Sequence, residues 1–240
     1  MQKHHSSLSL ASLLLLALPL LLSFRCQSTT AVYPDTSTRE GAAFSAISVE
    51  GSFEVVLHRG SQQPILLDGQ QLNNVITEVK DDKLFIKMDD DVKGNPSKIK
   101  VQITIPELQF IEIAGSGSVS SDASWGGDYT LVLSVAGSGQ IDVPIAGGQV
   151  KAGIAGSGSI TTSGNCNKAE VNIAGSGSYD GKMLISQESE VSIAGSGSAL
   201  VNATERVQGD VAGSGSIDVY GNPPQLEKSV AGSGKIKRMQ

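Results

Sequence analysis

Cysteine, histidine and aromatic residues are scarce in this chain of 240 residues, which has two cysteines, three histidines and 4% aromatic residues. Two cysteines are too few for the disulfide framework that stabilises many small secreted domains. Cys166 has no histidine near it in the sequence with which it could bind a metal ion. His58 is the only histidine after residue 5, and a histidine without a partner is weak evidence for acid–base catalysis. We therefore expect no catalytic residue, no metal and no cofactor.

Basic residues are also in the minority. The chain has 18 Lys and Arg residues against 24 Asp and Glu, a formal net charge of -6. Binding to nucleic acid depends on clustered Lys and Arg, so we expect no nucleic-acid partner. After the N-terminal leader, no apolar period of 3.6 residues lasts for ten residues, which predicts little or no helix.

Only one long hydrophobic run is present, at residues 8–22, and it follows Lys3. The run is too short to span a bilayer comfortably but is typical of a signal-peptide core. We predict a signal peptide over residues 1–28, with cleavage after Ser28 or after Ala31. No second run of membrane length follows, so we expect no transmembrane span in the mature chain, which would be exported to the periplasm or the cell surface.

Cys26 offers an alternative processing route. A lipoprotein signal would end at this cysteine and tether the protein to the outer membrane. Phe24 and Arg25 occupy the positions at which such a signal requires small side chains. Lipidation of Cys26 therefore stays the less favoured alternative.

The tetrapeptide Ala-Gly-Ser-Gly is the dominant pattern of the chain, and it recurs at intervals of 22, 19, 19, 20, 18 and 19 residues. A regular period near twenty residues predicts a solenoid, in which neighbouring units stack into one continuous core. The seven copies begin at Ala114, Ala136, Ala155, Ala174, Ala194, Ala212 and Ala231.

Apolar residues flank every copy of the tetrapeptide at fixed positions. The residue before the alanine is always β-branched, and the second residue after the last glycine is mostly apolar. This alternation is typical of a strand with one buried face. It places both glycines on the inward side, where they permit a bend or a close approach of neighbouring coils. The β-branched residues are Ile113, Val135, Ile154, Ile173, Ile193, Val211 and Val230.

The length of the unit suits a parallel β-helix. About twenty residues supply roughly 60 Å of extended chain, enough for two or three short strands and their turns. Coils stacked about 4.8 Å apart would align identical residues into ladders along the axis. We predict an all-β protein, a right-handed parallel β-helix with coils of about 20 residues. The handedness follows the general rule for parallel crossovers.

Glycine content divides the mature chain, because 23 of the 28 glycines lie at or after residue 114. Upstream of that point, short alternating bursts separated by turn residues predict strands. We expect a linker over residues 29–40, an N-terminal β region over 41–113 and the repeat β-helix over 114–240.

The leader, the segment Phe44-Ser-Ala-Ile-Ser-Val-Glu-Gly-Ser-Phe-Glu-Val-Val-Leu and the serial repeats together resemble a bacterial family. This family is described as putative auto-transporter adhesin, head GIN domain, and the resemblance covers about residues 41–236. It implies a right-handed β-helical, non-enzymatic protein of the cell envelope with an adhesin role. No catalytic or ligand-binding residues come with it.

Aspartate recurs in every second repeat, one residue after the apolar position that follows the tetrapeptide, at Asp142, Asp180 and Asp218. With coils about 4.8 Å apart, these carboxylates would lie about 10 Å from one another, near the upper limit for an inverting glycosidase pair. The pattern therefore keeps open a polysaccharide-degrading enzyme. The alternation also avoids stacking like charges, which is the interpretation that we favour.

Two further features allow two interpretations each. Trp125 and Tyr129 lie in the longest insertion between repeats, where they could stack on a sugar or pack at a corner of a coil. Lys235, Lys237 and Arg238 follow the last tetrapeptide. They protect the open edge of the stack or form a basic docking patch, and we favour edge protection.

The sequence as a whole predicts an exported binding or structural protein of the cell envelope. Its repetitive surface would bind glycans or surface proteins through many weak contacts. The alternatives are a β-helical polysaccharide-degrading enzyme and a self-assembling envelope scaffold that forms homo-oligomers.

Overall fold

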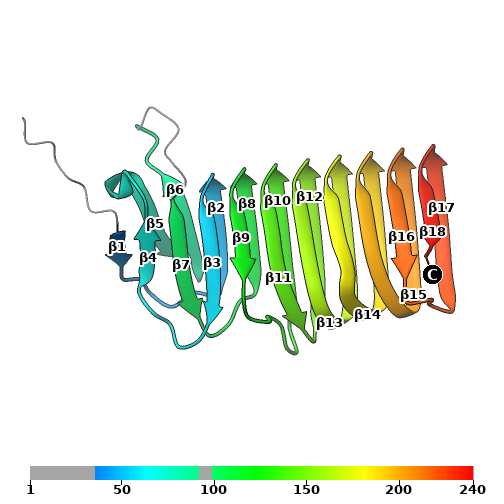
Figure 1. Ribbon diagram of the computed structural model, residues 1–240, viewed down its shortest axis with the longest axis horizontal. Coiled ribbons are helices and arrows are strands. Elements are labelled where there is room, and N and C mark those ends of the chain that lie inside the picture. Colours follow the sequence, from blue (N-terminus) through cyan, green and yellow to red (C-terminus); the bar gives the residue numbers. More distant parts are fainter. Residues whose placement is uncertain (1–35, 92–98, 240) are drawn as a thin grey trace, which may run out of the picture. The chain divides into compact units, whose positions relative to one another are not determined.

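The computed structural model describes residues 36–91 and 99–239 (Figure 1). The predicted signal peptide and Cys26 lie outside the described residues. In the described part, the regular elements are strands, apart from one 3-10 turn, η1 (Leu72–Asn74). None of its helical segments has the length and hydropathy needed to cross a membrane.

The repeats form a stack of parallel coils, which confirms the predicted parallel β-helix. In each coil, one strand leads into the tetrapeptide and another leaves it, and in Figure 1 these two sets of arrows point in opposite directions. We call them the pre-motif and post-motif sheets. The strands are β8 (Phe110–Gly115), β9 (Ser118–Ser121), β10 (Thr130–Gly137), β11 (Gln140–Ala146), β12 (Gln149–Gly156), β13 (Ser159–Gly175), β14 (Ser178–Gly195), β15 (Ser198–Gly213), β16 (Ser216–Tyr220), β17 (Gln225–Gly232) and β18 (Lys235–Arg238).

Equivalent residues of successive repeats pair directly across the coils. In the pre-motif sheet, Val135 pairs with Ile113 on one side and with Ile154 on the other. In the post-motif sheet, Ile141 pairs with Val119 and Ile160. All of these side chains are buried. The two apolar columns that flank the tetrapeptide therefore face each other and form the core, as predicted.

Both glycines of the tetrapeptide are required at the corner between the two sheets. Gly137 has φ +120°, and a Cβ there would lie 2.6 Å from the carbonyl oxygen of Gly115 in the preceding coil. A Cβ on Gly139 would lie 2.6 Å from Cγ2 of Ile113, the β-branched residue of the preceding coil. The first glycine thus makes the bend, while the second leaves room for its neighbour's core side chain.

The stacking order departs from the chain order in the N-terminal region. Strand β2 (Ala46–Gly51) pairs in parallel with β8 and with β6 (Lys83–Met88), and β3 (Glu54–Arg59) pairs likewise with β9 and with β7 (Lys100–Ile105). The coil made by β2 and β3 therefore lies between two coils that come later in the sequence. Strand β8 contains residue 114, at which the glycine-rich part of the sequence begins. It hydrogen-bonds to β2 on one side and to β10 on the other, so strand pairing continues across that boundary.

Antiparallel strands close the N-terminal end of the stack. Strand β5 (Val75–Lys80) pairs with β6, and β4 (Ile65–Asp68) pairs with β7. Strand β1 (Thr36–Arg39) then pairs with β4. Residues 36–39, expected in the linker, therefore form an edge strand, because a partner that is distant in the sequence supplies their backbone hydrogen bonds.

Candidate functional site

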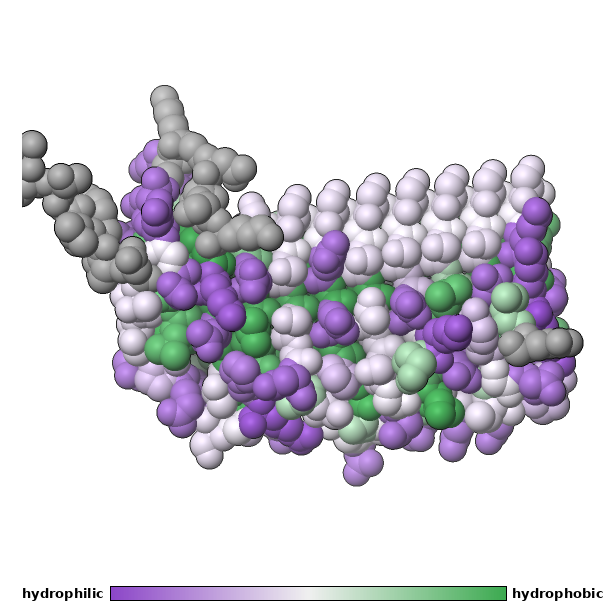
Figure 2. Space-filling model, viewed as in Figure 1, coloured by the Kyte–Doolittle hydropathy of each residue, from purple (hydrophilic) through white to green (hydrophobic). Residues whose placement is uncertain are grey.

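The aspartates form one column on the post-motif sheet. Asp142 pairs with Thr161, and Thr161 pairs with Asp180 in the next coil. Likewise, Leu200 pairs with Asp180 on one side and with Asp218 on the other. Successive aspartates are thus two coils apart, about 10 Å at the usual strand spacing. On the face seen in Figure 2, hydrophilic residues are spread along the stack below rows of small residues.

The aspartate column does not gather its carboxylates into a cluster. Within residues 36–91 and 99–239, no group of three or more His, Cys, Asp or Glu side chains is arranged to hold a metal ion. Each aspartate has an uncharged neighbour on at least one side, which keeps the like charges apart. The column therefore offers separate, equivalent polar groups to a partner.

Trp125 is buried, so of the two interpretations left open for it, stacking on a sugar does not hold. A parallel bridge to Ile145 draws the insertion against β11 and turns the indole inward. Its Nε1 donates a hydrogen bond to Ser121 Oγ over 2.8 Å, and the guanidinium carbon of Arg59 lies 5.9 Å from its ring centroid. Trp125 packs at a corner of the coil, the other interpretation. Tyr129, which follows four residues later in the same insertion, is partly buried.

A shallow groove runs across four coils of the pre-motif sheet, with a volume of about 370 Å³. Its banks consist of small residues, and its floor is formed by the backbone of the β-branched column, whose side chains are buried on the core side of the sheet. We call it the pre-motif groove. It is lined by Ser134, Val135, Ala136, Gly153, Ile154, Ala155, Asn172, Ile173, Ala174, Ser192 and Ala194.

The groove is open because small residues recur in register. Gly153 pairs with Ser134 and Asn172, and Asn172 pairs with Ser192, so between Glu112 and Asp210 no large side chain projects from this outward column. A Cβ on Gly153 would have its nearest neighbour at 4.0 Å, the carbonyl oxygen of Leu133. The strands that form the groove are paired on both sides, so their backbone groups are already hydrogen-bonded.

Two ion pairs lie on the same sheet beside the groove. Lys151 contacts Glu170 at 3.0 Å, and Lys168 contacts Glu190 at 3.0 Å. The hydrogen bond from Lys151 lowers the pKa of Glu170, and the hydrogen bond to Glu190 raises the pKa of Lys168. These ion pairs neutralise the charge of the sheet locally, so the groove does not favour a strongly charged partner.

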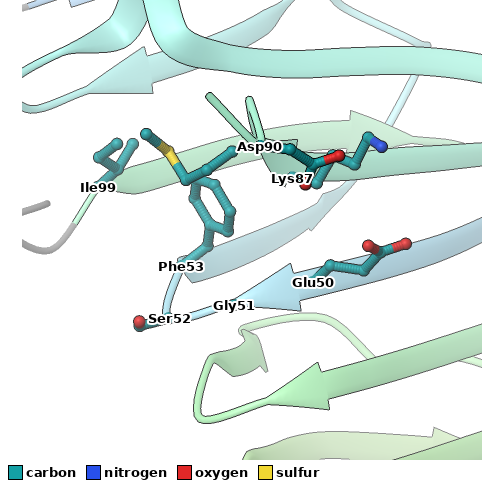
Figure 3. Close-up of a pocket in the computed structure, with 8 residues that line it drawn as sticks. Glu50, Gly51, Ser52, Phe53, Lys87, Asp90 and Ile99 are labelled. Atoms are coloured by element: carbon teal, nitrogen blue, oxygen red, sulfur yellow. The ribbon is translucent and has the colours of Figure 1, made fainter. Parts of the chain in front are cut away.

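A second pocket, of about 310 Å³, lies at the corner between β2 and β3. Figure 3 shows Phe53 and Ile99 on one side of it and Glu50 and Lys87 on the other. Strand pairing aligns Glu50 with Ala114 and Gly51 with Gly115. Residues 50–53, Glu-Gly-Ser-Phe, are therefore a divergent copy of the tetrapeptide.

The divergence at residue 53 explains why the sequence pattern did not reveal this pocket. Glu54 pairs with Ser118, so the buried Phe53 stands at the place of the second glycine. Only a search of the tetrapeptide that tolerated changes at both its first and its last residue would have found this copy. The pocket has an apolar wall and charged groups of both signs, which suits a small amphipathic molecule.

The chain matches a known protein family over most of its length. Residues 43–223 match the family model described as putative auto-transporter adhesin, head GIN domain, in agreement with the resemblance seen in the sequence. No curated protein matches the chain.

Several solved bacterial structures are similar to it. A putative adhesin from Bacteroides fragilis is 25% identical, with a TM-score of 0.74, and the match covers 85% of this chain and 96% of that one. A putative lipid binding protein from Parabacteroides distasonis is 24% identical, with a TM-score of 0.64 and coverage of 88% and 98%. A putative adhesin from the same species is 21% identical, with a TM-score of 0.65 and coverage of 85% and 96%.

Proposed function

Because the chain belongs to the family described as putative auto-transporter adhesin, head GIN domain, we propose that it is an exported, non-enzymatic binding module of the cell envelope. Its partner is an uncharged glycan chain that lies along the pre-motif groove. The observation that carries the proposal is the groove of small residues across four coils. A groove lined by residues that recur in register along the stack fits a linear, repetitive partner.

The chemistry of the groove favours a glycan over a peptide. A peptide that binds by adding a strand needs free backbone groups at a sheet edge, whereas the strands around the groove have partners on both sides. Asn172 and the serines at 134 and 192 offer hydrogen-bonding groups, and the alanine column offers an apolar surface to C–H groups. Several weak contacts of this kind, repeated along one chain, add to useful affinity.

The aspartate column supports binding more than hydrolysis. Its members are two coils apart, about 10 Å, which exceeds the separation of about 6.5–9.5 Å used by inverting glycosidases. Asp142, Asp180 and Asp218 form a second surface that could contact a partner, on the opposite sheet from the groove. Variants of both surfaces are therefore needed to assign the binding face.

The test is binding of the purified protein to a panel of glycans and matrix proteins. Gly153→Leu fills the groove from an outward position without entering the core, and we expect it to weaken glycan binding at least about tenfold, the loss of roughly 1.4 kcal/mol. Ser157→Leu is the matched control, since Ser157 is exposed at the corner of the same coil, outside both the groove and the aspartate column.

The outcomes separate the surfaces and the classes of function. Binding that is lost in the triple Asn variant of Asp142, Asp180 and Asp218, but kept in Gly153→Leu, would move the site to the aspartate column. Release of reducing sugar from any glycan on the panel would show an enzyme instead. Failure of every glycan to bind would refute the proposal.

Export is part of the same proposal. We propose that residues 1–28 act as a signal peptide and that the mature protein reaches the periplasm or the cell surface, with lipidation of Cys26 as the alternative route to an outer-membrane tether. Mass spectrometry of the N-terminal peptide from the native host distinguishes the two. A start at Thr29 or Val32 indicates ordinary cleavage, and a diacylglyceryl group on Cys26 indicates a lipoprotein.

A further inference from the structure

The two ends of the stack are finished differently. At the N-terminal end, β4 and β5 cover the outermost parallel coil with antiparallel pairing. At the other end, the coil formed by β17 and β18 pairs only with β15 and β16 among the described residues. The face of this last coil that points away from β15 and β16 is uncovered among the described residues. There, 44% of the surface of Val230 is exposed, whereas Val211, its partner in the preceding coil, is 3% exposed.

Two inward positions of this last coil hold cations. Lys228 pairs with Gly209, and the column behind it consists of Val191, Val171, Ala152 and Leu133, all uncharged. Arg238 pairs with Val219, which is fully buried. An inward charge in any earlier coil would be buried between neighbours, whereas at the end of the stack it reaches solvent.

Both cations fold back across the end of the coil. Lys228 Nζ donates a hydrogen bond to the carbonyl oxygen of Ile236 over 2.9 Å, so its side chain bridges from β17 to β18. Arg238 donates to the carbonyl oxygen of Pro223 over 2.8 Å and to Asn222 Oδ1 over 3.1 Å. Ile236 is consequently only 8% exposed, although it lies in the terminal coil.

The outward cations behave differently. Lys235 pairs with Ser216 and Lys237 with Asp218, so both continue outward columns of the post-motif sheet. The sequence assigns edge protection to Lys235, Lys237 and Arg238 together. Of these three, only Arg238 stands at an inward position, and the sequence pattern did not single out Lys228.

We propose that Lys228 and Arg238 form a polar cap that ends the stack and prevents the protein from associating end to end. A second copy, or any further coil, stacked on β17 and β18 would bury both charges. Neither has a carboxylate within ion-pair distance among the described residues. Burial of charges without such partners strongly disfavours association, and inward charges are a known means of protecting sheet edges. The proposal does not depend on which partner the groove binds.

The test compares the molar mass of the purified protein and its variants over a wide concentration range, by light scattering after size-exclusion chromatography. We expect the wild-type protein to stay monomeric. The double variant Lys228→Val and Arg238→Val exposes an apolar end, and its mass should rise toward twice the monomer value as concentration increases. The matched control, Lys235→Val with Lys237→Val, removes the same charge from outward positions and should stay monomeric.

Two outcomes would overturn the cap. One is a wild-type protein that already associates, with association lost on introducing Val230→Lys at the open end. The other is a folded double variant that stays monomeric at all concentrations. If the double variant fails to fold, as judged by its circular dichroism, Lys228→Val alone is compared with Lys228→Gln. The valine variant should associate and the polar glutamine variant should not, and equal behaviour of the two would refute the role of Lys228.

Discussion

Substitution of the second glycine of a repeat should destabilise the stack far more than substitution of a glycine in the same coil that faces outward. Gly158 and Gly153 provide this comparison. A Cβ on Gly158 would lie 2.5 Å from Cγ1 of Val135 and 2.6 Å from the carbonyl oxygen of Gly139, both in the preceding coil. At Gly153 the nearest atom would lie at 4.0 Å, and the backbone has no positive φ.

The contacts set the size of the effect. Overpacking of a well-packed site costs about 1–3 kcal/mol, and the shift also strains the hydrogen bond from Ser159 N to Gly139 O, 3.0 Å long, worth about 1 kcal/mol. We therefore expect Gly158→Ala to lower the free energy of unfolding by roughly 3 kcal/mol. Gly153→Ala should raise it by about 0.5 kcal/mol, because alanine restricts the unfolded chain.

Thermal unfolding followed by circular dichroism measures the difference. For a protein of this size, 3 kcal/mol corresponds to a fall in Tm of roughly 6–12 °C. Amide hydrogen exchange adds a local readout, since protection of the Ser159 amide should fall in Gly158→Ala and not in Gly153→Ala. Equal Tm values for the two alanine variants would show that the close approach at the corner relaxes freely, which would refute the reasoning.

Three smaller predictions concern buried side chains. Trp125→Phe removes the indole hydrogen bond to Ser121 and should cost about 1–2 kcal/mol in urea unfolding, with glycan binding unchanged; weaker binding would contradict its structural role. Tyr179→Phe removes the 2.8 Å hydrogen bond to Thr162 in the core and should cost a similar amount, about 1–2 kcal/mol, whereas wild-type stability would mean that the bond contributes nothing. Burial raises the pKa of Cys166 from 9.0 to about 11, so the unfolded state loses the thiol proton first and stability falls as pH rises between these values. Cys166→Ala should flatten that pH dependence of the unfolding midpoint, and an unchanged slope would assign it to other groups.

The repeats could be predicted well from the sequence because their physical constraints are local. A β-branched residue, two glycines and an apolar residue recur at fixed offsets, and each offset corresponds to one side of a strand or to the corner. The pairing of Val135 with Ile113 and Ile154 follows directly from that register. The core and the parallel stacking were therefore predictable without knowledge of any distant contact.

The remaining features depend on contacts between segments that share no pattern. Strand β2 lies between β6 and β8, with Val49 opposite Ile86 and Ile113, and no periodicity of the sequence indicates this order. Burial of Trp125 depends on a bridge to Ile145 across an irregular insertion. Lys228 stands two residues before Val230, so strand alternation places it inward, but only the pairing of β17 with β15 alone shows that this inward charge lies at an open end.

The position of the β2–β3 coil also determines how the molecule can be assembled and divided. This coil is the first parallel coil along the chain, yet the stack extends from it in both directions, toward β6 and β7 on one side and toward β8 and β9 on the other. During synthesis from the N-terminus, the chain would thus produce the β2–β3 coil before either of the two coils that stack on it. Deletion of residues 46–59 would not shorten the stack of coils from one end. It would remove the joint between the capped end and the repeats, leaving two separate pieces in one polypeptide.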